Sequence, residues 1–151
     1  MKRTEKFRLG DLLLQQGLIT EDQLALALEQ QKKVKLRLGR ILVNNGFVTE
    51  ESISESLAKQ LGIRYINLKD FHLKLDLVRT LPEDKARRFQ AIVLEEANNS
   101  LLVGMSDPTD LNGADEISRI LNRAVDVAVV TEGQLLESLE RSYSRTQLNL
   151  G

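Results

Sequence analysis

The stretch "RLGDLLLQQG", residues 8–17, decides the fold because the chain repeats it. The segment "RLGRILVNNG", residues 37–46, has the same arginine, leucine and glycine at its start. Gly10 and Gly39 stand among apolar residues at helical spacing, where a glycine costs about 1 kcal/mol relative to alanine. Two such glycines in register require a physical reason.

The repeat extends well beyond this stretch. Aligning "RLGDLLLQQGLITEDQLALALEQQ" (residues 8–31) with "RLGRILVNNGFVTEESISESLAKQ" (residues 37–60) gives nine identities in 24 positions. The spacer "KKVKL", residues 32–36, separates the two copies. Self-similarity of this extent indicates a duplication. We call the copies motif 1 and motif 2.

Each motif predicts a helix, a turn and a second helix. Gly17 and Gly46 suit left-handed caps that end the first helix, and Thr20 and Thr49 suit N-caps of the second. The second helices carry a stripe at spacing i, i+3, i+4, i+7, which shares one face. Its members are Leu24, Ala27, Leu28 and Gln31 in motif 1, and Ile53, Ser56, Leu57 and Gln60 in motif 2. Both stripes end in glutamine where the period favours an apolar residue.

The pattern changes after Gly62. Runs typical of β-strands follow at residues 63–68, 90–97, 101–106 and 124–130. The tripeptide "NNS" at 98–100 predicts a hairpin between the second and third runs. Helices are predicted at residues 82–89, 110–121 and 132–143. The sequence therefore predicts an α+β fold, with an all-helical subdomain over residues 1–62 and a small α+β subdomain over residues 63–151.

Composition excludes several function classes. The chain has no cysteine, which excludes disulfides and thiolate metal sites. His72 is the one histidine in the sequence, which excludes histidine triads and histidine-rich metal sites. No glycine is followed by lysine, so the GxxxxGK[ST] phosphate loop of ATPases is absent. The carboxylates show no acid–base pattern, and we expect no enzyme and no metal in this chain.

Charge and hydropathy indicate the compartment and the partners. No apolar run approaches the ~18 residues of a membrane span, and the start "MKRTEKF" lacks a signal-peptide core. We therefore expect a cytoplasmic location without membrane insertion. Neither subdomain is basic enough for general nucleic-acid binding. The cluster of Lys32, Lys33, Lys35, Arg37 and Arg40 forms a local positive patch, which is most simply a solvated face.

Arginine and glycine recur at the start of both motifs. Arg8 and Arg37 precede the glycines, and a guanidinium pairs with phosphate and stacks on a base. Gly10 and Gly39 lack a Cβ, which allows either close helix packing or approach of a ligand to the backbone amides. The residues alone leave both interpretations open.

Amide and carboxylate side chains add further candidates. Gln31 and Gln60 either meet the polar edge of a base or phosphate, or form a helix–helix hydrogen bond. In "SDPTD", residues 106–110, Asp107 or Asp110 is suited to cap a turn before the helix.

The duplicated pattern of Arg-Leu-Gly, paired aliphatics, Gly, two more aliphatics, Leu and a terminal Gln resembles the MshEN domain. That domain is the N-terminal, cyclic di-GMP-binding region of type IV pilus and type II secretion assembly ATPases. The resemblance implies a regulatory domain that binds cyclic di-GMP and couples it to an ATPase whose catalytic part is absent from this chain. The implied partners are that ATPase domain and the inner-membrane platform of the pilus or secretion machinery.

The resemblance also assigns ligand-binding residues. A duplicated motif suits a ligand with two equivalent halves, and Asp107 is assigned to the guanine N–H groups. The assigned residues are Arg8, Leu9, Gly10, Leu24, Leu28, Gln31, Arg37, Leu38, Gly39, Ile53, Leu57, Gln60 and Asp107. Ile53 departs from the usual leucine, which is a change of shape only.

Two other classes of function compete with this interpretation. A protein-interaction scaffold, in which the repeat serves packing alone, explains the leucines but not Arg-Leu-Gly. A helix-turn-helix nucleic-acid binder must present basic or amide side chains to DNA. The second helices begin instead with Thr20-Glu21-Asp22 and Thr49-Glu50-Glu51, whose carboxylates would repel phosphates.

Overall fold

The computed structural model describes residues 8–144. Contacts along the chain divide it into two compact units, Met1–Ser56 (unit 1) and Leu57–Gly151 (unit 2). One helix, α4 (Glu50–Leu61), runs through this division. The subdomain boundary expected at residue 62 falls just after the end of that helix and stays a prediction.

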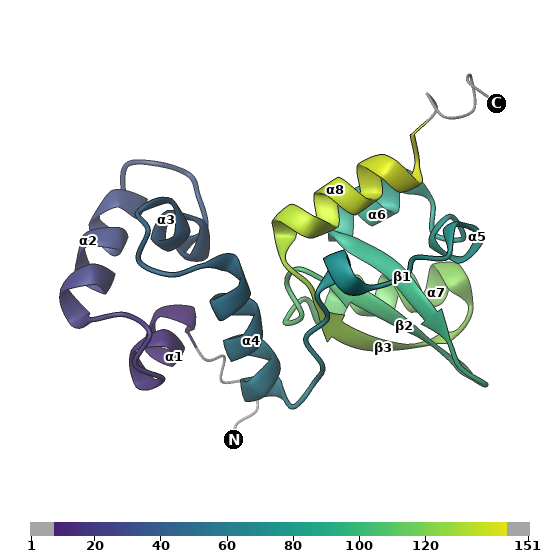
Figure 1. The fold of residues 1–151 in the computed structure, drawn as a ribbon, viewed down its shortest axis with the longest axis horizontal. Helices are drawn as coiled ribbons and strands as arrows, with labels where there is room; N and C mark the ends of the chain where they lie inside the picture. The colour runs from purple at the N-terminus through teal and green to yellow at the C-terminus, as the bar shows by residue number, and fades with distance from the viewer. Residues whose placement is uncertain (1–7, 145–151) are drawn as a thin grey trace. The chain divides into compact units, whose positions relative to one another are not determined.

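Unit 1 consists of the paired helices that the two motifs predict (Figure 1). Within it α2 packs against α3, and α1 packs against α3. The helices are α1 (Leu9–Gln15), α2 (Glu21–Gln31), α3 (Leu38–Asn44) and the first part of α4 (Glu50–Leu61).

The glycine caps predicted for the first helices are confirmed. Gly17 and Gly46 have φ angles of +74° and +77°, in the left-handed region that favours glycine. In motif 1 the Leu18 N–H donates to the Leu13 carbonyl at 2.9 Å, and the Gly17 N–H donates to the Leu14 carbonyl at 3.0 Å. This is the Schellman arrangement that ends a helix. Motif 2 repeats it around Gly46.

The threonine N-caps are confirmed as well. Thr20 Oγ1 accepts from the Gln23 N–H at 3.1 Å, and Gln23 Oε1 accepts from the Thr20 N–H at 2.9 Å, forming a capping box. In motif 2, Thr49 Oγ1 accepts from the Ser52 N–H at 3.0 Å. Each motif therefore carries its own start and stop signals, and the two copies fold alike.

The core of unit 1 is small. Five side chains form its buried cluster, and apolar residues of both motifs pack around them while remaining partly exposed. The buried residues are Leu13, Ile19, Ala27, Ile41 and Leu42. The partly exposed ones include Leu9, Leu24, Leu38 and Ile53, so four of the apolar residues assigned to the ligand lie at the edge of the core.

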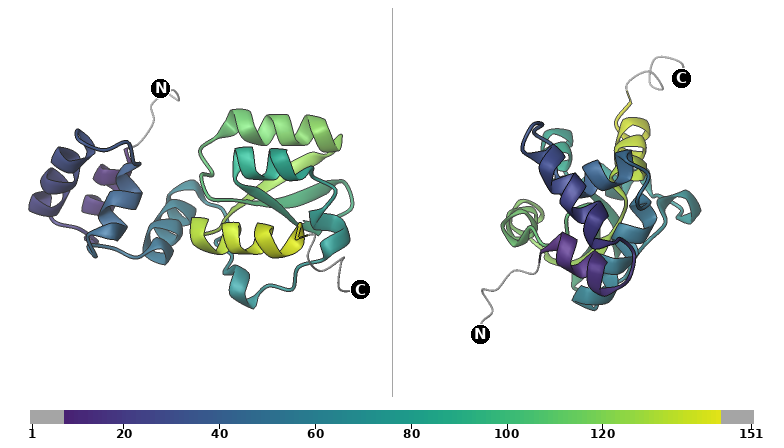
Figure 2. Two further views of the ribbon diagram at one scale, coloured as in Figure 1. Left: turned by 90° about the horizontal axis from the view of Figure 1, so that it is seen from above. Right: turned by 90° about the vertical axis from the view of Figure 1, so that its left-hand side faces the viewer.

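Unit 2 is built on a three-stranded sheet in the order β1-β2-β3. The hairpin between β1 and β2 is antiparallel, as predicted, and β3 lies parallel to β2. Helices α6 and α8 pack against β1, and α7 packs against β3 (Figures 1 and 2). The elements are the 3₁₀ helix η1 (Leu68–Asp70), α5 (Leu75–Val78), α6 (Glu83–Phe89), β1 (Ala91–Glu96), β2 (Ser100–Met105), α7 (Leu111–Leu121), β3 (Ala124–Val129) and α8 (Glu132–Ser142). The α+β fold class is confirmed.

The prediction of a strand at residues 63–68 is wrong. Tyr65 forms a single parallel bridge with Val129, supported by the Ile66 N–H on the Val129 carbonyl at 2.9 Å. The chain then turns away from the sheet, because the Asn67 side chain accepts from the Lys69 N–H at 3.0 Å and caps η1. β-Propensity was present, but the local asparagine cap competed with further pairing.

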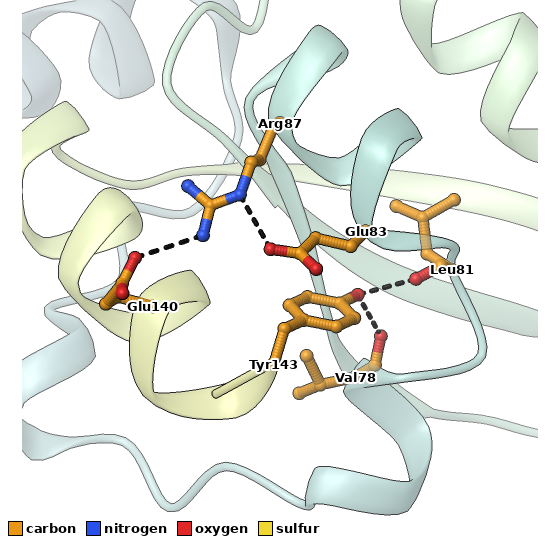
Figure 3. A network of polar contacts seen from close by, with 6 residues as sticks. All are labelled: Val78, Leu81, Glu83, Arg87, Glu140 and Tyr143. Carbon is orange, nitrogen blue, oxygen red and sulfur yellow. Dashed lines mark hydrogen bonds and ion pairs between the residues drawn. The ribbon is translucent and has the colours of Figure 1, made fainter. Parts of the chain in front are cut away.

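A polar network fastens α8 to the segment before the sheet (Figure 3). The Tyr143 hydroxyl donates to the carbonyls of Val78, at 2.8 Å, and Leu81. Burial, followed by the charge of Glu83, raises the pKa of Tyr143 to about 12. Nearby, Arg87 bridges Glu83 and Glu140 at 2.9 and 3.2 Å. The neutral phenol is therefore the form that holds these elements together.

No helix within residues 8–144 is both long enough and apolar enough to cross a membrane.

Candidate ligand-binding site

Gly10 lies beneath leucine side chains of both motifs. It is buried, and a Cβ placed on it would lie 2.7 Å from Leu24 Cδ1 and 3.3 Å from Leu38 Cδ2. The first distance is shorter than real side-chain contacts allow. Leu24 belongs to motif 1 and Leu38 to motif 2. A side chain at position 10 would therefore displace the end of the Leu24 side chain, and glycine allows the close packing between the motifs.

Gly39 repeats the arrangement with the motifs exchanged. A Cβ on Gly39 would lie 3.2 Å from Leu9 Cδ2 of motif 1 and 3.5 Å from Ile53 Cδ1 of its own motif. Leu9 is the counterpart of Leu38, and Ile53 is the counterpart of Leu24. Each glycine is thus covered by one residue of its own motif and one of the other. The two motifs form a pair with approximate two-fold symmetry, which answers why both glycines are there.

The motif arginines stand at equivalent places. Arg8 and Arg37 are the N-cap residues of α1 and α3, and both are exposed with extended backbone angles. Neither side chain caps its own helix. Each arginine therefore lies at the N-terminus of the helix that carries the glycine of its motif.

The stripe on the second helices is less buried than its period predicts. Leu24 is partly buried, but Leu28, one turn further along α2, keeps 43% of its surface exposed. The stripe pattern predicts that Leu28 packs the helices together, and its exposure shows that this prediction is wrong. Leu28 is available instead as an apolar surface for a ligand. On α4, Leu57 is partly buried and Gln60 is exposed.

The two stripe glutamines differ in their surroundings. Gln31 Nε2 donates to the carbonyl of Leu36, in the spacer, at 3.1 Å. This contact is neither of the two roles considered from the sequence. Sequence patterns do not show it because its acceptor is a backbone atom, which any residue supplies. Gln60 lies at the exposed end of α4 in unit 2.

Asp107 takes part in the turn that its segment predicts. Its Oδ1 accepts from the Thr109 N–H at 3.1 Å. Asp110 is the N-cap of α7 and accepts from the Gly113 N–H at 2.9 Å, which confirms the capping interpretation for that residue. A contact between Asp107 and guanine stays a prediction.

The positive patch is partly neutralised by carboxylates. Lys32 pairs with Glu29 at 3.5 Å and Arg40 with Glu50 at 3.2 Å. Within residues 8–144, Lys33 and Lys35 are exposed and take part in no ion pair. This supports the expectation of a solvated face for the spacer lysines.

A concavity of about 290 Å³ lies beside the spacer. Its lining residues are Gln30, Lys33, Val34, Leu36, Ile41, Asn44 and Asn45. None of the thirteen residues assigned to the ligand lines it, so it is separate from the candidate site. Within the described part of the chain, no group of three or more histidine, aspartate or glutamate side chains is arranged to hold a metal ion.

Comparison with known proteins places the chain in a family. The model of the MshEN domain matches residues 61–147, which is the α+β part rather than the two motifs that carried the resemblance. The structure of MshE with cdg (cyclic di-GMP) is 37% identical and superposes with a TM-score of 0.78, covering 91% of this chain and 100% of that chain.

Two longer proteins are similar to the chain over most of its length. The type IV pilus assembly ATPase PilB of Myxococcus xanthus is 34% identical over 137 residues, 91% of this chain. Bacteriophage adsorption protein B of Escherichia coli is 29% identical over 143 residues, 95% of this chain. The chain spans 24% and 15% of these relatives, respectively. The family model matches more than half of the chain, and the structure of MshE with cdg resembles it over 91% of its residues. Together with the paired glycine motifs, these matches show that the chain belongs to the MshEN domain family.

Proposed function

We propose that the chain binds cyclic di-GMP on its two motifs, with one ligand molecule per chain. The observation that carries the proposal is the exchange of packing at Gly10 and Gly39, which gives the motifs approximate two-fold symmetry. Cyclic di-GMP consists of two equivalent halves, each with a guanine, a ribose and a phosphate. A two-fold pair of motifs can offer the same set of groups to each half.

The residues at the motifs have the chemistry that such a ligand needs. Arg8 and Arg37 are exposed cations that can pair with a phosphate and stack on a guanine. The sequence has 4% aromatic residues and no tryptophan, so stacking falls to arginine. The partly exposed Leu9, Leu24 and Leu38, together with Ile53, supply an apolar floor. The likeness to MshE with cdg supports the same assignment.

We further propose a regulatory, non-catalytic role in a longer protein. PilB is the relative at 34% identity and is an assembly ATPase of which this chain spans a quarter. The ligand would then act on an ATPase domain and, through it, on the pilus or secretion platform. Bacteriophage adsorption protein B contains a similar region, so the test of binding must precede any test of coupling.

Calorimetric titration of the chain with cyclic di-GMP tests the proposal. We expect saturation near one equivalent and much weaker heat with a linear guanine dinucleotide, because only the cyclic ligand presents both halves in fixed geometry. A DNA duplex serves as the control for general charge and should give no saturable binding. Absence of binding by the folded chain would favour a scaffold that works without nucleotide. Saturation at two equivalents would contradict the shared site.

A further inference from the structure

The second helix of motif 1 is tied to the spacer that leads into motif 2. Gln31 is the last residue of α2, and its Nε2 donates to the Leu36 carbonyl at 3.1 Å. Earlier in the spacer, the N–H groups of Lys33 and Val34 donate to the Gln30 carbonyl at 2.9 and 3.2 Å. Residues 35–37 follow outside any helix, strand or turn. The Gln31 amide therefore anchors the segment just before α3.

The held carbonyl belongs to the peptide unit that carries Arg37. The Leu36 C=O and the Arg37 N and Cα atoms lie in one plane because the peptide bond is planar. Holding the Leu36 oxygen therefore restrains the peptide plane that includes the Arg37 Cα. On its other side the Arg37 carbonyl accepts from the Ile41 N–H at 3.2 Å, as the first bond of α3. The backbone of Arg37 is held at both ends.

We infer that Gln31 is a positioning residue, which acts on the ligand by setting the place of Arg37 in the other motif. The inference rests on the proposed function, since Arg37 is there assigned to cyclic di-GMP. It assigns the glutamine of motif 1 a contact with Leu36, the last spacer residue, directly before the arginine of motif 2. Because the contact is exposed, water can replace the amide on the Leu36 carbonyl when it is removed. Loss of the contact is therefore expected to affect the order of Arg37 more than the stability of the fold.

Motif 2 has no equivalent contact among the described residues. Gln60 occupies the matching position at the end of α4, and the counterpart of Leu36 is Tyr65. Tyr65 instead bridges Val129 of β3. Among the described residues, the glutamine of motif 1 therefore acts on the segment before the arginine of motif 2, and the glutamine of motif 2 makes no matching contact.

A double-mutant cycle on cyclic di-GMP affinity tests the inference. Gln31→Met keeps the length of the side chain and its preference for helix but removes the donor. We expect it to weaken affinity about two- to tenfold, the range of one hydrogen bond's net effect. Combined with Arg37→Ala, it should cause no further loss, because a residue that acts through Arg37 has nothing left to position. Combined with Arg8→Ala, the two losses should multiply.

Gln60→Met is the matched control, because its effect should multiply with that of Arg37→Ala. A multiplicative effect of Gln31→Met with Arg37→Ala would overturn the inference and would indicate that Gln31 meets the ligand independently.

A second measurement uses the ligand-free chain. In amide NMR spectra, Gln31→Met should shift and broaden the Arg37 signal, whereas Gln60→Met should leave it in place. If the wild-type chain fails to bind cyclic di-GMP, the proposed function fails, and this measurement still decides whether Gln31 positions Arg37. An unchanged Arg37 signal in Gln31→Met would overturn the positioning role.

Discussion

Motif 1 and motif 2 share their caps and their glycine packing but differ in the charges between their helices. In motif 2, Arg40 of α3 pairs with Glu50 at the start of α4, at 3.2 Å. The matching residues of motif 1 are Asp11 and Glu21, which are both acidic. The shared caps and glycine packing give both motifs the same framework. The charges differ, because an ion pair joins the two helices of motif 2 whereas motif 1 has two carboxylates at the matching positions. The sequence repeat therefore predicts the framework that the motifs share better than it predicts the stability of each motif.

The motif arginines should show the largest effect. Arg8→Ala and Arg37→Ala should each weaken cyclic di-GMP binding about tenfold to a hundredfold, because a hydrogen bond to a charged group is worth about 1.5–3 kcal/mol. Both side chains are exposed, so thermal stability of the free chain should change little. Lys33→Ala is the matched control in the spacer, and titration calorimetry is the measurement. Equal losses in all three variants would indicate diffuse attraction by the positive patch.

The paired glycines should respond differently to the same change. Gly10→Ala places a methyl group 2.7 Å from Leu24 Cδ1. Overpacking of this kind costs about 1–3 kcal/mol, which outweighs the gain of up to about 1 kcal/mol in helix preference. Gly39→Ala meets its nearest atom at 3.2 Å and gains up to about 1 kcal/mol of helix preference. Urea unfolding should therefore show a loss of stability for Gly10→Ala and little change or a gain for Gly39→Ala. Equal losses at both positions would show that the two halves are packed equally tightly.

Leu28 separates ligand contact from core packing. A fully buried leucine contributes about 1.5–3 kcal/mol, but Leu28 is 43% exposed. Leu28→Ala should therefore lower the free energy of unfolding by less than about 1 kcal/mol, while cyclic di-GMP affinity falls severalfold. Leu26→Ala, at 47% exposed on the same helix, is the control for a leucine outside the stripe. A loss of stability above about 2 kcal/mol for Leu28→Ala would place it in the core.

The smallest effect concerns the charge difference itself. Asp11→Arg should create in motif 1 the ion pair that Arg40 and Glu50 form in motif 2, with Glu21 as the partner. Asp11 and Glu21 are both exposed, and an exposed pair of this kind contributes about 0.2–1 kcal/mol. Thermal unfolding at low and high salt measures the gain, which should shrink as salt screens the charges. A gain that is independent of salt would argue against the ion pair.

Local signals explain which parts of the fold could be predicted. Thr20 and Gly17 act on backbone groups within a few residues, so their caps could be read directly from the sequence. The covering of Gly10 by Leu38 depends on how two distant helices meet, and the sequence left packing and ligand approach equally open. Residues 63–68 had the composition of a strand, but the cap formed by Asn67 ended the pairing.

For the candidate site, the sequence predicts which residues are equivalent in the two motifs but not the contacts that these residues make. Duplication identified Arg8 and Arg37 as equivalent, and the structure places both as N-caps of matching helices. The exposure of Leu28 was not predictable, because helical period gives the face of a residue but not what covers it. The bond from Gln31 to Leu36 was hidden for a related reason, since the acceptor is a main-chain oxygen.

The exchange of leucines between the motifs also bears on how such a domain evolves. A lone motif would leave Gly10 uncovered on the side where Leu38 lies, and it could complete this packing only by pairing with a second chain. The five-residue spacer makes that pairing intramolecular, so its strength no longer depends on protein concentration. The two halves are then inherited together in one gene. Each half is free to diverge, as Leu24 and Ile53 have done, as long as it still covers the glycine of its sister copy.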